Sequence, residues 1–402
     1  MKKLVLSLAL VATVTFAFGQ KKVVKEAEKG FKSGNLQAAL VAIDSASRNP
    51  ETENDPSTYL LKAKIYTKIF VKDSTNNLET LESGNLALAT FTKVFQMVDS
   101  SKSSPVGKLV FAVDDQSIPE NIKPYSINSL RNFSLEKAVE RYEENDIEMS
   151  YEFFNLAGEI DKSDTSTIFN AGFLANDLGR FEDAKKHFYQ LLEFPSYNKL
   201  NAYYYLLQIL STEEKNPQAA FDLVKKAKEE YPNDKVLNEA EIQLLIQLDK
   251  MEDAMVQIKD ALSNDPNNST LLLRSGYLKD RAGDLSGALE DYKKSVEVDP
   301  EFYEGNKYTG LLYLDQFKLI QDELNKMEDA EWERRSPEMG KKMEETYKLA
   351  VPYLSKALVI KPDDTEIMII LFQVYTRLKN TVEANAMNEK ISAILGPNWQ
   401  EN

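Results

Sequence analysis

The residue types that most often carry catalytic chemistry are scarce in this chain of 402 residues, which has one histidine, His187, and no cysteine. A nucleophile–histidine arrangement needs a hydroxyl or thiol beside an imidazole, and a zinc site usually needs several His or Cys ligands. One imidazole completes neither arrangement, so we expect His187 to be structural or solvated. The sequence therefore predicts no enzyme, with no catalytic residue, no metal site and no cofactor.

Loop motifs that could bind ions are no stronger. Asp265-Pro266-Asn267-Asn268 supplies oxygen atoms, but a calcium loop needs ligands at alternate positions, a glycine at the turn and a distant glutamate. Proline stands at the second position here, and no such glycine follows. Glycines occur singly along the chain, so the sequence also lacks a glycine-rich phosphate loop. We interpret this motif as a turn between repeats.

The strongest pattern in the sequence is a repeat. Pro232, Pro266 and Pro300 are spaced by 34 residues, and each follows an alanine by twelve residues. Those alanines are Ala220, Ala254 and Ala288. A fixed period of this length indicates a solenoid in which two-helix units pack on their neighbours. The chain is therefore predicted to be all-α.

The clearest unit spans residues 269–302. Gly276 and Ala288 are small, which lets the two helices of the unit approach closely, and Tyr292 is expected to fill the groove behind them. Gly283 supplies the positive φ of a helix exit, and Pro300 ends the second helix. Each residue type thus matches a helix–turn–helix unit.

This unit resembles the tetratricopeptide repeat family, whose signature places small residues at the helix crossings, a bulky residue four positions after the second of them, and a closing proline. The same register extends to about nine units, whose small residues include Ala39, Ala87, Ala138, Gly172, Ala220, Ala254, Ala288, Ala350 and Ala384. The resemblance implies a right-handed superhelical solenoid with first helices lining a concave face. It also implies a role in holding other proteins.

In this family, the residues that flank the small residue of each first helix face the concave groove. The resemblance therefore implies a set of partner-binding residues: Asn170, Phe173, Asn176, Tyr204, Gln208, Gln243, Tyr277 and Arg281. Equivalent positions are held by Asn201, Glu239, Leu273, Gln373 and Arg377. Such a mixed aromatic and amide surface suits a peptide or a helical segment.

Two further expectations concern the residues of this groove. Tyr203, Tyr204 and Tyr205 are consecutive and point in different directions, so at least one should be exposed; packing of all three between units is the alternative. Some members of the family grip a C-terminal carboxylate with cations on successive first helices. That set is not evident here, because Tyr204, Glu239 and Gln243 occupy the positions concerned.

Three interruptions of the period divide the chain. Gly310 and Ala350 are 40 residues apart instead of twelve, which predicts an inserted helical hairpin at about residues 316–343 whose second helix opens at Ser336-Pro337 and contains Pro352. A loop is expected at residues 73–77. Residues 100–125 are expected to be an irregular linker between N-terminal repeats (20–99) and a main array (126–402). Within that linker, residues 108–113 fit a short strand, a docked apolar patch or a loop pinned by Leu109 and Phe111.

The N-terminus reads as a signal peptide at residues 1–19. Lys2 and Lys3 precede an apolar run over residues 4–18, which is shorter than the roughly 20 residues of a spanning helix. Cleavage would leave Gln20 first, and the protein would be exported to the bacterial periplasm or secreted. The formal net charge of −15 disfavours nucleic acid as a partner, and no later segment is apolar enough to span a membrane.

Together these features predict a non-enzymatic protein–protein interaction scaffold or adaptor of the bacterial periplasm or cell envelope. It would bind peptide or helical segments of a partner protein in its concave groove. A glycan-binding envelope protein built on the same repeat frame is the alternative.

Overall fold

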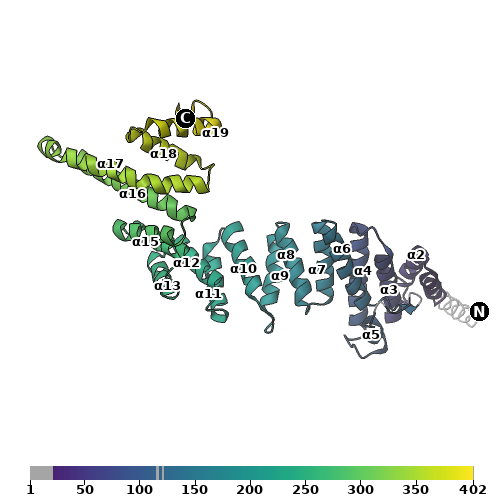
Figure 1. Ribbon diagram of the computed structural model, residues 1–402. Coiled ribbons are helices and arrows are strands. Elements are labelled where there is room, and N and C mark those ends of the chain that lie inside the picture. The colour runs from purple at the N-terminus through teal and green to yellow at the C-terminus, as the bar shows by residue number, and fades with distance from the viewer. Residues whose placement is uncertain (1–20, 115–116, 120–121, 402) are drawn as a thin grey trace, which may run out of the picture. The chain divides into compact units, whose positions relative to one another are not determined.

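The computed structural model describes residues 21–114, 117–119 and 122–401, which fold largely into helices joined by short turns (Figure 1). Their contacts divide the chain into two units, the first ending at Tyr231 and the second beginning at Pro232. The expected signal peptide at residues 1–19 lies outside the described residues. Among the helices that the structure describes, none is long and apolar enough to cross a membrane.

The first unit is a row of helix pairs that stand side by side in chain order (Figure 1). After helical residues 21–33 it contains α2 (Leu36–Ala46), α3 (Pro56–Lys72), α4 (Leu78–Met97), α5 (Pro105–Val110), α6 (Ile127–Glu143), α7 (Ile147–Ile160), α8 (Thr165–Asp177), α9 (Phe181–Leu192), α10 (Leu200–Gln208) and α11 (Pro217–Glu230). A π-helical turn, Ile209–Glu213, extends α10. All of these helices except the short α5 form pairs, so that α6, α8 and α10 are first helices of successive repeats.

The second unit continues the pattern. It contains α12 (Lys235–Gln247), α13 (Met251–Asn264), α14 (Ser269–Arg281), α15 (Leu285–Val298), α16 (Tyr303–Asn325), α17 (Asp329–Ile360), α18 (Thr365–Arg377) and α19 (Thr381–Leu395), followed by a 3₁₀ turn, Trp399–Glu401. Counting helical residues 21–33 with α2, the described part of the chain forms nine helix pairs. The predicted all-α solenoid of helix–turn–helix repeats is confirmed.

Small residues at the crossings bring the paired helices together, as the sequence predicts. Gly276 of α14 lies against the ring of Tyr292 of α15, and a Cβ added to Gly276 would come within 2.6 Å of that ring. Ala288 and Tyr292 are both buried. Gly283 has a φ of +83° at the exit of α14. Asn268, from the motif considered for calcium, instead caps α14 by accepting a hydrogen bond from the Leu271 N–H at 3.0 Å.

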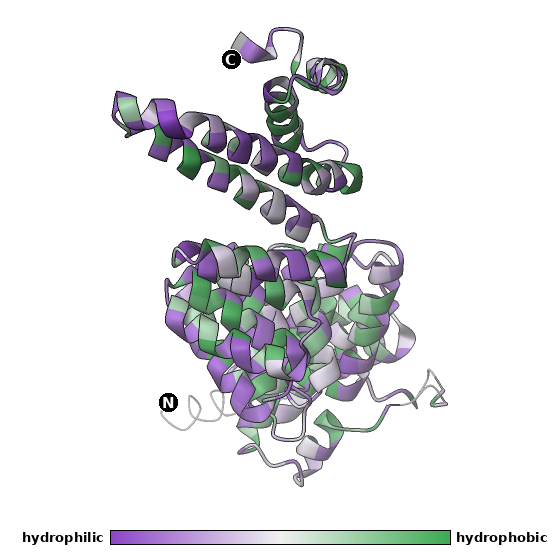
Figure 2. Ribbon diagram, turned by 60° about the vertical axis from the view of Figure 1, so that its left-hand side comes forward, coloured by the Kyte–Doolittle hydropathy of each residue, from purple (hydrophilic) through white to green (hydrophobic). Residues whose placement is uncertain are grey.

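The predicted hairpin is formed by α16 and α17, which extend beyond the body of their repeat; we call this extension the arm. Phe317 and Tyr347 stack across it with ring centroids 4.3 Å apart, and Arg335 Nη2 pairs with Glu323 Oε1 at 2.6 Å. Hydrophilic residues cover much of the arm (Figure 2). The interior of the arm is thus held by a narrow apolar seam.

The predicted start of the second arm helix is wrong. Helix α17 begins at Asp329, and Pro337 lies inside it, as does Pro352. A proline leaves the carbonyl four residues earlier without its helical donor. Both prolines are exposed, so water can reach the turns in which these carbonyls lie. The helix therefore continues through a Ser-Pro pair that would normally mark a beginning.

The two other interruptions are part of the packed structure. In the loop at residues 73–77, Asn76 is only 2% exposed, and Lys137 Nζ of α6 donates hydrogen bonds to its side-chain oxygen and to the Asp73 carbonyl. Asn76 Nδ2 in turn donates to Glu140 Oε2 at 2.6 Å. These bonds fix the loop to α6, the first helix of the following pair.

Within residues 100–125, α5 is a helix, whereas the sequence allowed a strand, an apolar patch or a loop at residues 108–113. The face that docks carries Val110, which is fully buried, and Phe111, whose ring packs edge-on against Phe95 at 5.1 Å. Leu109 is 47% exposed, so this side chain does not anchor the segment in the way expected of it. The contacts of the chain divide at Tyr231, not in this segment.

Candidate functional site

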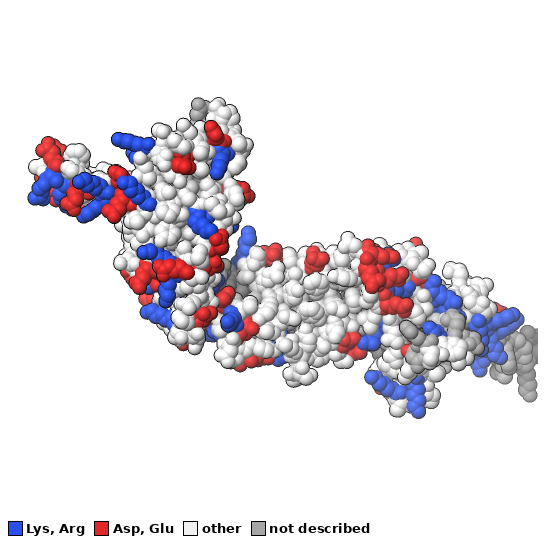
Figure 3. Space-filling view, viewed as in Figure 1, with Lys and Arg blue, Asp and Glu red and all other residues white. Residues whose placement is uncertain are grey.

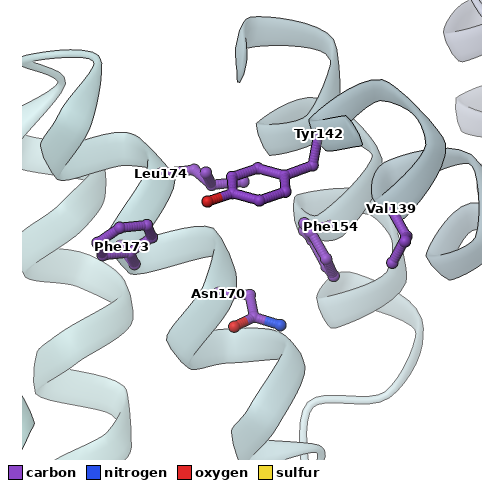
Figure 4. Close-up of a pocket in the computed structure, with 6 residues that line it drawn as sticks. All are labelled: Val139, Tyr142, Phe154, Asn170, Phe173 and Leu174. Atoms are coloured by element: carbon purple, nitrogen blue, oxygen red, sulfur yellow. The ribbon is translucent and has the colours of Figure 1, made fainter. Parts of the chain in front are cut away.

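A pocket of about 300 Å³ opens in the first unit, where the first helices α6 and α8 lie beside α7. We call it the first-helix pocket. Its lining residues are Val139, Tyr142, Phe154, Asn170, Phe173 and Leu174. The ring of Tyr142 extends from α6 toward α8, with its hydroxyl directed toward Leu174 and Phe173 (Figure 4). Asn170 and Phe173 are two of the predicted partner-binding residues, so the structure brings these two together.

Local interactions fix the helices that carry the pocket. Asp164 caps α8 by accepting a hydrogen bond from the Thr167 N–H at 3.2 Å, and Arg131 of α6 forms an ion pair with the same carboxylate. The guanidinium and these hydrogen bonds hold the pKa of Asp164 below its ordinary value, although burial opposes this. At the crossing of α8 and α9, a Cβ on Gly172 would lie 3.0 Å from the Phe188 ring. The pocket is therefore built on rigid elements.

The chemistry of the first-helix pocket is that of an apolar receptor. Phe154 and Leu174 form a buried floor, whereas Val139 is 47% and Tyr142 51% exposed. Exposed aromatic and aliphatic side chains of this kind bury area when a partner binds. The polar groups in the lining are the Tyr142 hydroxyl and the Asn170 amide, both of which can donate and accept hydrogen bonds. The arrangement suits binding of an apolar side chain with one or two hydrogen bonds.

The other predicted residues of the first unit lie along the same series of helices. Asn176 is half-buried on α8, and its Oδ1 is buried without a described donor, so this acceptor is not presented at the surface. Tyr204 is half-buried and Gln208 exposed on α10. Between the two helices, the Tyr205 ring packs edge-on against Phe173 at 6.1 Å.

The expectation that one of the three consecutive tyrosines is exposed is wrong. Tyr203 is fully buried, and its hydroxyl donates to Glu230 Oε1 at 2.9 Å. Tyr205 stacks on Phe188 with centroids 4.9 Å apart, and both Tyr204 and Tyr205 are half-buried. The rings of Tyr203 and Tyr205 pack against neighbouring helices, as in the alternative that the sequence left open.

The predicted residues of the second unit are spread along its first helices. Gln243 is exposed on α12, Arg281 is exposed at the end of α14, and Tyr277 packs against the cluster formed by Ala288, Tyr292 and Leu312. Gln373 and Arg377 of α18 instead line a second pocket, of about 520 Å³, together with Phe317 and Tyr347 of the arm. We call it the arm pocket.

His187 is structural, as expected. It is 5% exposed and packs edge-on against Tyr151 with ring centroids 6.3 Å apart. Burial, and secondarily the charge of Lys186, lowers the pKa of its imidazole, which is therefore neutral at physiological pH. In the part of the chain that the structure describes, no group of three His, Asp or Glu side chains is arranged to hold a metal ion.

Sequence reasoning missed Val139 and Tyr142, which supply one wall of the first-helix pocket. The signal was present: Val139 follows the small residue Ala138 directly, and Tyr142 stands four residues after it. Phe173 and Asn176 have the same spacing from Gly172. The register includes Ala138, but this repeat matches the family signature at few other positions, so its flanking residues do not stand out in the sequence.

Charge is unevenly distributed over the surface. In the view of Figure 3, the middle of the first unit carries few charged residues, whereas the arm carries Lys, Arg, Asp and Glu side by side. Several arm charges neutralise one another, as in the ion pairs of Lys342 with Glu338 at 3.0 Å and of Lys348 with Glu344 at 2.6 Å.

No family model matches the chain. Solved tetratricopeptide repeat proteins do match it. YrrB, a tetratricopeptide repeat protein with an unusual peptide-binding site, is 20% identical with a TM-score of 0.36, and the match covers 43% of this chain and 88% of YrrB. A repeat protein from Parabacteroides merdae is 16% identical over 73% of this chain and 98% of its own, with a TM-score of 0.30.

The C-terminal part of a repeat-containing protein from Cytophaga hutchinsonii is 14% identical over 65% of this chain and 95% of its own, with a TM-score of 0.45. These are members of the family that the sequence pattern resembles. The solenoid fold itself is established by the helix pairs described above.

Proposed function

We propose that this chain is a non-enzymatic interaction scaffold that binds a peptide or helical segment of a partner protein on the first helices of its repeats. The observation that carries the proposal is the first-helix pocket. Its walls are apolar, two of its side chains are about half exposed, and its polar groups are a phenol and an amide. Such a lining offers a partner both buried area and hydrogen bonds.

The neighbouring repeat extends this surface. Phe173 of α8 contacts Tyr205 of α10, which is the next first helix in the series. The exposed Gln208 also lies on α10. A segment that fills the pocket with one side chain can therefore continue along α8 and α10. A series of first helices is well suited to an elongated ligand because each repeat adds a similar set of contacts.

Site-specific photo-crosslinking in the native host tests this function. A photoreactive phenylalanine analogue is placed at Tyr142, and the matched control carries it at Tyr189, which is 43% exposed on the second helix α9. We expect a discrete protein adduct from position 142 that the Phe173→Ser variant abolishes. Equal adducts at both positions, or none at 142, would contradict the proposal. Saturable binding of a polysaccharide that depends on Tyr142 would instead identify the glycan-binding alternative.

We also propose that the protein acts in the periplasm, at the cell envelope or after secretion. The support is the sequence of residues 1–19, with Lys2 and Lys3 before an apolar run and small residues near its end. Cell fractionation followed by N-terminal sequencing tests this. Recovery in the envelope or medium with Gln20 as the first residue is expected, and an uncleaved protein in the cytoplasmic fraction would refute it.

A further inference from the structure

The arm pocket combines two features that the sequence treats separately, the inserted hairpin and a first helix of the repeat series. Phe317 of α16 and Tyr347 of α17 form its arm side, and residues of α18 from Ile370 to Arg377 form the other. Its volume of about 520 Å³ lies within the range of roughly 300–1,000 Å³ over which ligand pockets occur. The pocket belongs entirely to the second unit and is independent of the first-helix pocket.

The base of the pocket is rigid. A single apolar cluster joins the arm helices to α18, and it includes Tyr313, Leu354 and Leu371. The Phe372 ring of α18, which also lines the pocket, packs edge-on against Trp399 at 5.3 Å, and Trp399 Nε1 donates a hydrogen bond to Asn388 Oδ1 at 3.0 Å. The wall that Phe317 and Tyr347 build is therefore held at a fixed place relative to α18.

The floor of the pocket is apolar, but its rim carries positive charge. Arg377 is exposed at the end of α18, and no described residue forms an ion pair with its guanidinium. Its charge acts on the Tyr347 hydroxyl, where it opposes the rise in pKa that burial causes. A cation in the last turn of a helix is favoured by the helix dipole, yet that interaction leaves its hydrogen-bond donors unused.

The acidic side chains of the arm that form ion pairs do so with other cations and not with Arg377. Glu344, on the preceding turn of α17, is bound by Lys348 Nζ at 2.6 Å. Arg335 on the same arm pairs with both Glu323 and Glu331. In a chain of net charge −15, an apolar pocket lined by an exposed Arg377 that has no ion-pair partner among the described residues is complementary to an acidic group.

We propose that the arm pocket binds a short segment of a partner protein in which an apolar side chain stands next to a carboxylate. The apolar side chain packs against the wall formed by the stacked Phe317 and Tyr347 rings on one side and against Ile370 on the other. Arg377 binds the carboxylate with its fork of N–H donors, and the exposed Gln373 amide lies on the same helix to bind the peptide backbone.

Selection from a library of short random peptides displayed on phage tests this proposal. The full chain is the bait, and peptides retained by the support without the protein are removed, so that no variant biases the selection. The enriched peptides are then synthesised with a dye, and their dissociation constants are measured by fluorescence anisotropy. Arg334→Glu is the matched control, because it makes the same charge change at an exposed arm residue outside the pocket.

We expect the enriched peptides to place an aromatic or aliphatic residue beside Asp, Glu or the C-terminal carboxylate. Arg377→Glu should weaken their binding by about tenfold or more, the effect of losing one charged hydrogen bond. Arg334→Glu and Phe173→Ser should leave it unchanged. Peptides in which Lys replaces the acid should bind Arg377→Glu better than the unaltered protein.

Three results would overturn the proposal. The enriched peptides could show no preference for an acidic group, or they could bind Arg377→Glu as tightly as the unaltered chain. Alternatively, the protein could form dimers that Arg377→Glu dissociates while no peptide is enriched, which would make a second copy of the chain the occupant. Peptides that lose binding with Phe173→Ser, and not with Arg377→Glu, would report the first-helix pocket and leave the proposed function intact.

Discussion

The amine of Lys137 donates a hydrogen bond to the side-chain oxygen of Asn76, which precedes it by 61 residues. Lys137 is 6% exposed, and its Nζ also lies 5.3 Å from the centroid of the Phe70 ring. One cation on α6 thus joins the loop after α3 to the next helix pair. The loop expected at residues 73–77 therefore has a structural role.

Replacing Lys137 with methionine should destabilise the first unit. The long side chain is retained, but Asn76 and the Asp73 carbonyl lose a charged donor, which costs about 1.5–3 kcal/mol of unfolding free energy. Chemical denaturation followed by circular dichroism measures this loss. Lys186→Met is the control, because the Lys186 side chain is 63% exposed and its ion pair with Glu159 is expected to contribute at most about 0.5 kcal/mol. Equal stability of the two variants would show that the loop is not held by Lys137.

Two glycine-to-alanine changes should act in opposite directions. At Gly276 a Cβ would lie 2.6 Å from the Tyr292 ring, which is fully buried, so Gly276→Ala should destabilise the protein by about 1–3 kcal/mol. At Gly340, inside α17, a Cβ would meet nothing within 4 Å, so Gly340→Ala should stabilise the arm by about 0.5–1 kcal/mol. Thermal melting of both variants beside the parent checks the signs. A neutral Gly276→Ala would show that the ring can shift.

The burial of His187 predicts a pH dependence of stability. Its folded-state pKa lies below the ordinary value of 6.5, so the unfolded chain binds a proton more readily than the folded one as the pH falls. The contribution of the neutral His187 side chain to the unfolding free energy should therefore be complete above about pH 7. It should decrease as the pH falls through 6.5 toward the folded pKa. Asp183 and Glu159 reduce this shift, and Lys186 adds to it.

Comparison with His187→Gln isolates this contribution from that of the carboxylates. The stability difference between the parent and the variant should shrink as the pH is lowered from 7.5 to 5. Because His187 is the only histidine, its imidazole proton resonance gives the folded pKa directly by NMR titration. A measured pKa at or above 6.5 would contradict the buried, neutral imidazole.

Shortening the arm should leave both units folded. Removing residues 318–324 and 340–346 takes about two turns from each helix, which preserves the faces that meet. Phe317 and Tyr347 remain, so the stacked pair at 4.3 Å should persist and the arm pocket with it. Circular dichroism should show a helical protein with a small loss of helix signal. A cooperative loss of the whole signal would show that the outer arm supports the core.

The sequence predicts those parts of the fold that depend on residue size and period. Gly276, Ala288 and Tyr292 meet where the repeat register places them, because a close helix crossing admits only small residues. The start of α17 was not predictable in this way. Ser336-Pro337 has the composition of a helix start, and only the exposure of the surrounding turn shows that the helix can pass through it.

Of the two candidate sites, the first-helix pocket follows in part from the repeat register and the arm pocket does not. Asn170 and Phe173 follow from the register. Tyr142 has the same spacing from Ala138, but its repeat matches the family signature weakly, so the pattern does not single it out. The arm pocket could not be predicted, because it depends on where an insertion of variable length folds back against α18. Period alone gives no information about the direction that an inserted hairpin takes.

The turn between the arm helices, residues 326–328, contacts little besides the arm itself, and Lys326 and Glu328 are exposed. The two helix ends that this exposed turn joins lie close together, and exposed turns of this kind tolerate the insertion of a foreign domain. A fluorescent protein inserted there would leave both pockets and both chain termini unaltered. The arm therefore provides an internal labelling point for following this protein in living cells.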